Sequence, residues 1–173
     1  MKTILSIGFS RIFTVLFLMG TLFTACSEDN EGHGEENTPT TLAVTYSFKL
    51  TQDYLKLVDA TVTYWNEKGE QKTDPLTATS WEKKLVLNAS QEFGFKVNAT
   101  PKANIDELLT ATSYVMGYEY SCNYWSSKGN GKSVSFTVSD ATSKDKVKAY
   151  IEKYPEIYKF NMKWNKDTDA FAN

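Results

Sequence analysis

The residue types that most often perform catalysis are scarce in this chain. It contains a single histidine, His33, which lies in a short acidic segment. A Ser-His-Asp or Cys-His arrangement needs a histidine held within hydrogen-bond reach of its partners, and a flexible segment cannot hold one there. A His-based zinc site in the rest of the chain is excluded on the same count. The sequence therefore predicts a protein that is not an enzyme and that carries no metal or cofactor.

The cysteines and carboxylates also give no indication of a catalytic site. Cys122 is expected to be a small buried residue, because no neighbouring histidine or helix start is present to activate it as a reactive thiol. A glycosidase would need two carboxylates about 5 to 10 Å apart. The candidate acids are scattered along the chain without local pairing, and they are Asp53, Asp59, Asp74, Glu92 and Glu119. Nucleotide-binding motifs of the type GxGxxG or GxxxxGK[ST] are absent.

Aromatic residues are the one excess in the composition, with ten Tyr, ten Phe and four Trp. Trp65, Trp81, Tyr124 and Trp125 lie at predicted strand ends or opposite the main apolar face of their strands. We hypothesise that they form an exposed platform on which sugar rings stack. The alternative is that they cover a second sheet face or a sheet edge.

The first part of the chain has the layout of a secretory signal. Residues 1–11 carry Lys2 and Arg11 without any acid, and residues 12–23 are almost entirely apolar. This apolar run is shorter than the roughly 20 residues that a transmembrane helix needs. The charged start and the short apolar run are typical of a signal peptide that is removed from the mature protein.

The apolar run ends in Leu-Phe-Thr-Ala-Cys at residues 22–26, which resembles the lipobox of bacterial type II signal peptides. Ala25 and Cys26 match that pattern, whereas Phe23 stands where leucine is commonest, as in the looser boxes of Bacteroidetes lipoproteins. The resemblance implies cleavage after residue 25 and lipidation of Cys26, which would anchor the chain to a membrane. An ordinary secretory peptide with an incidental cysteine is the alternative.

Residues 26–40 are expected to form a flexible tether. Five of the 21 acidic residues of the chain lie within residues 27–36, which contain no Lys or Arg. Such a segment has too little apolar surface to fold and repels itself. Ser27 followed by acids also resembles the signal that sends some Bacteroidetes lipoproteins to the outer face of the outer membrane, while a plain spacer facing the periplasm is the alternative. Beyond the tether the charges nearly balance, so nucleic acid is not an expected partner.

The remaining chain alternates apolar and polar residues with a period of two, which predicts strands. A turn is predicted at residues 66–69, and a hairpin at residues 128–132, where Gly129 and Gly131 flank Asn130. One helix is predicted after Thr142 or Ser143, ending at Pro155. The predicted strands cover residues 44–50, 58–64, 81–87, 93–99, 113–125, 134–138 and 158–164.

Six or seven strands with one late helix predict a mostly β fold for residues 41–173, in a single domain. We expect an immunoglobulin-like or transthyretin-like β-sandwich, with a partly open barrel as the alternative. The anchor, the sandwich and the missing catalytic residues favour a non-catalytic binding or adhesion module for a glycan or a protein, on the cell surface. The alternative is a structural or assembly role, in which an exposed strand edge pairs with a neighbour. An exposed aromatic cluster would favour the first function, and a long uncovered edge strand the second.

Overall fold

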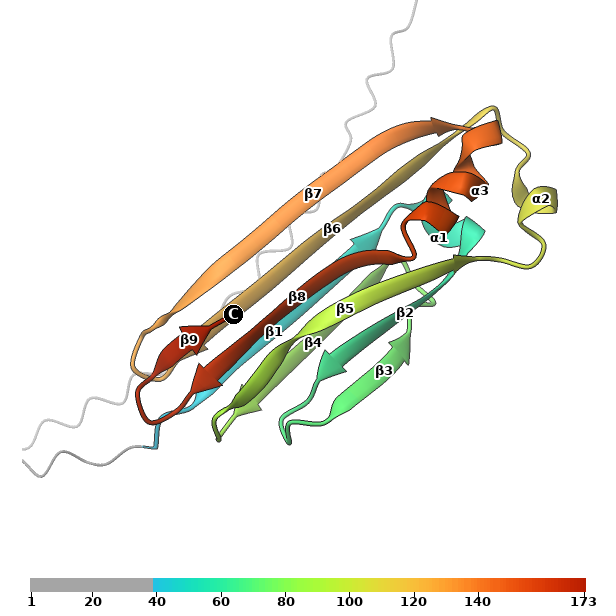
Figure 1. The fold of residues 1–173 in the computed structure, drawn as a ribbon. Helices are drawn as coiled ribbons and strands as arrows, with labels where there is room; N and C mark the ends of the chain where they lie inside the picture. Colours follow the sequence, from blue (N-terminus) through green and yellow to red (C-terminus); the bar gives the residue numbers. More distant parts are fainter. Residues whose placement is uncertain (1–38) are drawn as a thin grey trace, which may run out of the picture. The chain divides into compact units, whose positions relative to one another are not determined.

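The computed structural model describes residues 39–173, so the predicted signal peptide, Cys26 and the tether as far as residue 38 lie outside the described residues. Within residues 39–173 the chain forms nine strands and three short helices (Figure 1). The strands are β1 (Leu42–Leu50), β2 (Val58–Trp65), β3 (Gln71–Pro75), β4 (Ser80–Leu87), β5 (Gln91–Pro101), β6 (Ser113–Ser126), β7 (Gly131–Ser143), β8 (Glu156–Asn165) and β9 (Ala170–Ala172). The helices are α1 (Gln52–Leu57), α2 (Ile105–Leu108) and α3 (Lys144–Lys153).

The strands form two sheets in which every pair of neighbours is antiparallel. One sheet has the order β4-β1-β6-β7, and the other has the order β3-β2-β5-β8-β9. The sheets pack face to face as two layers, and the helices gather at one end of them (Figure 1). This arrangement confirms the predicted β-sandwich with a late helix. The alternative, one partly open barrel, does not fit two sheets with separate strand orders.

The core lies between the two layers and follows from the alternation in the sequence. In β1, every second side chain is buried, from Leu42 to Leu50. Tyr46 and Phe48 contact Phe95 of the opposite sheet, with ring centroids 5.4 and 6.4 Å apart. Burial of alternate apolar side chains removes their surface from water, which is the main stabilising contribution in a sandwich.

The first strand occupies an inner position in its sheet. β1 pairs with β4 along one side and with β6 along the other. Just before it, the Thr41 N–H donates to Ser127 Oγ at 3.1 Å, and the Ser127 N–H donates to the Thr41 carbonyl at 2.9 Å. The chain therefore enters the sandwich beside the β6–β7 hairpin, at the end opposite the helices (Figure 1).

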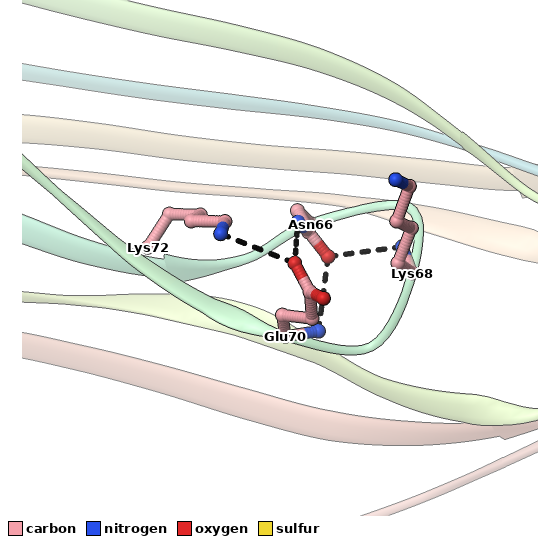
Figure 2. A network of polar contacts seen from close by, with 4 residues as sticks. All are labelled: Asn66, Lys68, Glu70 and Lys72. Carbon is pink, nitrogen blue, oxygen red and sulfur yellow. Dashed lines mark hydrogen bonds and ion pairs between the residues drawn. The ribbon is translucent and has the colours of Figure 1, made fainter.

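The β2–β3 hairpin was predicted only as a turn, and β3 was missed. Its turn is held by Asn66, whose Oδ1 accepts the N–H groups of Lys68 and Glu70, both at 2.9 Å (Figure 2). Glu70 Oε2 in turn accepts from Asn66 Nδ2 and from Lys72 Nζ, both at 3.1 Å. The Asn66 bond first and the Lys72 contacts second lower the pKa of the Glu70 carboxyl. Turn chemistry of this kind sets a register without any apolar pattern, which explains why β3 gave no periodic signal.

The predicted helix is confirmed, and its apolar side closes one end of the core. α3 begins directly after Ser143 and ends before Pro155, and its Val147 and Ile151 are fully buried. Two further short helices sit at the same end. They bury Tyr54 and Leu57 of α1 and Ile105 of α2.

A buried carboxylate, Asp169, links the two sheets at the end of the sandwich opposite the helices. It lies in the β8–β9 turn and accepts hydrogen bonds from Ser126 Oγ at 2.7 Å, Asn130 Nδ2 at 2.6 Å and Trp164 Nε1 at 3.0 Å. Ser126 and Asn130 belong to the β6–β7 hairpin, so the contacts join the ends of the two sheets. The predicted glycine hairpin is confirmed here, with Gly129 at a φ of +87°.

Candidate functional site

Two of the four aromatic residues predicted to form a platform lie within the sandwich. Tyr124 is 3% exposed and packs against Phe93 of the opposite sheet, with ring centroids 5.2 Å apart. Trp81 packs between the layers against Tyr64, at 5.4 Å, and donates its indole N–H to Asp74 Oδ2 at 3.1 Å. Neither side chain is available as part of an open surface for sugar rings.

The other two face solvent from opposite sides of the molecule. Trp65 lies on the outer face of the five-stranded sheet, half-buried, while Trp125 lies on the outer face of the four-stranded sheet and is 50% exposed. The prediction that Trp65, Trp81, Tyr124 and Trp125 form one platform is therefore wrong. Successive side chains of a strand point to opposite faces of its sheet. Trp81 and Tyr124 lie an even number of residues from buried neighbours and therefore point into the core. Trp65 and Trp125 lie an odd number away and point outward.

The remaining cysteine of the described part is a core residue. Cys122 is fully buried, and burial raises the pKa of its thiol to about 12, so the thiolate required for nucleophilic chemistry is not populated at neutral pH. Between residues 39 and 173, no cluster of three or more His, Cys, Asp or Glu side chains is placed to hold a metal ion.

Among the described residues 39–173, no strand covers the outer edge of β7. This strand pairs with β6 along its whole length without a register shift, and it ends the order of its sheet (Figure 1). Two hydrogen bonds just beyond the ends of β7 show which of its backbone groups bond to β6. The Ser126 N–H donates to the Asn130 carbonyl, and the Lys144 N–H donates to the Thr112 carbonyl. In an antiparallel ladder, bonded and non-bonded pairs alternate. The odd-numbered residues of β7, such as Thr137, therefore direct their N–H and C=O groups away from the sheet.

The opposite layer also ends in an incomplete edge next to β7. β9 pairs with β8 only from Lys163 to Asn165, so within the described part of the chain no strand pairs with Glu156 to Met162 on that side. Between the two edges lies a strip of aromatic side chains. Phe136 of β7 is 53% exposed and lies 6.2 Å from Tyr120, which stacks on Tyr158 of β8 with centroids 3.6 Å apart. We call this strip, made of Tyr120, Phe136 and Tyr158, the aromatic seam.

The environment of the aromatic seam is apolar. Burial is the largest effect on Tyr158 and raises the pKa of its hydroxyl, and the contact with Tyr120 raises it further. The Tyr158 hydroxyl is therefore neutral at physiological pH. Phe136 has the same strand phase as Val134 and Val138, and all three face the open side of the core where β9 does not extend.

Sequence reasoning assigned Val134, Phe136 and Val138 to a strand but missed the edge that they form. The alternation of apolar and polar residues shows which side chains of a strand face the core. It does not show whether the strand lies in the middle or at the edge of its sheet. A weaker signal was present, because Ser133, Ser135, Thr137 and Ser139 give this strand a small, uncharged polar face.

Comparison with protein families, with curated proteins and with solved structures finds no significant match to this chain. No helix within residues 39–173 is long and apolar enough to cross a membrane. The fold and the site thus define a class only: a β-sandwich whose two layers both end in an uncovered strand edge, with an aromatic seam between them.

Proposed function

We propose that this chain is a non-catalytic, lipid-anchored module of the bacterial cell envelope, which binds another protein by strand addition at the β7 edge. The uncovered β7 edge is the observation that carries the proposal. A strand that adds to such an edge gains main-chain hydrogen bonds for affinity, and it gains specificity from the side-chain pockets beside the edge.

The edges formed by β4 and β3, on the other side of the sandwich, are protected, and this contrast supports a role for β7. β4 carries Glu82, Lys83 and Lys84, while β3 is short and contains Lys72, Asp74 and Pro75. Charges, prolines and short strands are the usual means by which proteins prevent edge pairing. The thirteen residues of β7 contain no proline, and their only charges, Lys132 and Asp140, lie away from the centre of the strand.

The aromatic seam provides the second element of recognition. An incoming strand paired with β7 would place alternate side chains over Phe136 and toward the open part of β8. An apolar side chain at that place would cover Phe136, whose exposed surface is unusual for an inward-facing residue of a sandwich. This favours an assembly role over binding of glycan to an aromatic platform, since the four predicted platform residues lie apart.

The edge can be tested with Thr137→Pro. The Thr137 N–H points away from β6, so proline removes a donor from the free edge without breaking the ladder. We expect a photo-crosslinking amino acid at position 136 to give an adduct of defined mass when the full chain is expressed in its native cells. Thr137→Pro is expected to reduce that adduct at least tenfold.

Thr137→Ala is the matched control, because it removes the same side chain and keeps the N–H, and it should leave the adduct intact. The same crosslinker at position 82, on the protected β4 edge, should give none. An adduct that survives Thr137→Pro, or that forms equally from position 82, would show that β7 is not the docking edge.

The proposed anchor has a separate test. Cys26→Ala is expected to abolish metabolic labelling by a fatty acid, while Cys122→Ala should keep the label because that thiol is buried. Retention of label in Cys26→Ala would refute the anchor. Protease treatment of intact cells then gives the orientation: digestion places the domain on the cell surface, and protection places it in the periplasm with an envelope-assembly partner.

A further inference from the structure

A second site lies on the outer face of the five-stranded sheet, away from the β7 edge. A hollow of about 240 Å³ opens there over β2, β5 and β8. Its lining includes one aromatic ring, one glycine and four side chains that can hydrogen-bond to a ligand, and these residues are Trp65, Gly94, Glu92, Lys96, Lys159 and Asn161.

The arrangement of the hollow follows from the strand register. Gly94 of β5 pairs with Asn161 of β8, and the pairing of Tyr64 with Phe95 places Trp65 of β2 beside Gly94 on the other side. The Trp65 indole N–H donates to Asn161 Oδ1 at 3.0 Å. Neighbouring strands are about 4.8 Å apart, so this bond spans two strand spacings and lays the indole across β5 at the glycine. The result is an aromatic surface beside polar side chains.

Two lysines give the hollow its electrostatic character. Lys96 and Lys159 are direct cross-strand partners, and neither forms an ion pair with another residue of the described domain. Like charges placed opposite each other destabilise a sheet. The carboxylate on the far side of the hollow, Glu92, is contacted by Asn161 Nδ2 at 3.4 Å and does not neutralise the pair. A pair of unneutralised cations next to a hollow is suited to an anionic ligand.

We propose that this hollow binds a sugar ring that carries a carboxylate. The ring lies against Trp65, because the C–H face of a sugar is apolar and packs on aromatic surfaces. The carboxylate lies between Lys96 and Lys159, where charge-assisted hydrogen bonds form, and Glu92 and Asn161 accept or donate to the ring hydroxyls. A shallow site of this size gives a dissociation constant of about 1 mM for a single ring.

The test is a calorimetric and NMR titration of the full chain with acidic trisaccharides made of galacturonate, of glucuronate or with a terminal sialic acid. The methyl ester of each trisaccharide, which lacks the negative charge, is the control ligand. At least one acid is expected to bind at least tenfold more tightly than its ester, and the preference should shrink as the salt concentration rises. The double variant Lys96→Gln/Lys159→Gln should lose that preference, while Lys84→Gln/Lys132→Gln, on the other sheet, should keep it.

The same double variant provides a readout without ligand. Removal of the cross-strand repulsion should leave the melting temperature unchanged or slightly raised, so a loss of binding cannot be ascribed to unfolding. Absence of binding by all three acids, equal binding of acids and esters, or an unchanged preference in Lys96→Gln/Lys159→Gln would each overturn the proposal. None of these outcomes bears on the β7 edge, which lies in the other sheet.

Discussion

Gly94→Ala is expected to lower the free energy of unfolding by about 3 to 5 kcal/mol, because strain and overpacking act together at this position. The Gly94 φ of +146° lies in a region that only glycine adopts readily. A Cβ added there would lie 2.1 Å from the Phe160 carbonyl oxygen, which is backbone and cannot move aside. The Gly94 N–H also donates to the buried Tyr46 hydroxyl at 2.8 Å, and a shifted strand would lose this bond. Urea unfolding followed by tryptophan fluorescence measures the effect.

Gly129→Ala is the matched control for Gly94→Ala. Gly129 also has a positive φ, +87°, but nothing lies within 4 Å of the added Cβ. Its replacement should cost about 1 kcal/mol, which is the backbone preference alone. If the two variants lost equal stability, the close approach of β5 and β8 at Gly94 would not be a rigid feature of the fold.

Asp169→Ala is expected to destabilise the domain by about 3 kcal/mol, since hydrogen bonds to a charged group contribute about 1.5 to 3 kcal/mol and their buried donors would be left without a partner. The buried donors are Ser126 and Trp164, whereas Asn130 is exposed and can bond to water instead. Asp169 has a φ of +50°, which aspartate and asparagine tolerate better than alanine. Asp169→Asn should therefore lose less stability than Asp169→Ala, because it keeps the backbone preference and one acceptor oxygen.

The pH dependence follows from the same contacts. Burial alone raises the pKa of Asp169, but the bonds donated by Ser126, Trp164 and Asn130 together lower the pKa below its ordinary value. A carboxyl group with a lowered folded-state pKa contributes stability above its unfolded pKa of about 3.9, and loses it as the pH falls through the folded-state pKa. Urea midpoints between pH 7 and pH 2 should show this loss in the native chain and a shallower one in Asp169→Asn. Parallel profiles would rule out Asp169 as a source of acid sensitivity.

Much of the sandwich could be predicted because strand alternation reports directly on burial. Val44 to Leu50 and Val58 to Tyr64 alternate without error, and their even-numbered residues are the ones that the core buries. The late helix and the glycine hairpin were predictable from residues that favour specific backbone conformations. β3 and β9 were not, because a polar edge strand and a three-residue strand carry no apolar period. They form through turns and ladder bonds that depend on the neighbouring strands.

The candidate sites were harder to predict than the fold. Strand phase was enough to place Trp81 and Tyr124 inside, and a stricter use of it would have removed them from the aromatic platform. The β7 edge and the paired lysines depend on strand order, which alternation does not encode. Lys96 and Lys159 lie far apart in the sequence and become neighbours only because β5 pairs with β8.

The inner position of β1 has a mechanical consequence. Tension on the chain before Thr41 is transmitted along β1, which is bonded on one side to β4 and on the other to β6. Ladder bonds run perpendicular to the strands, so a pull along β1 shears many of them at once instead of peeling them one by one. A partner strand held along β7 would lie parallel to the same direction and would share this geometry. If the chain is anchored before β1 and bound along β7, as we propose, this geometry would let it carry force between the two points without unravelling from its first strand.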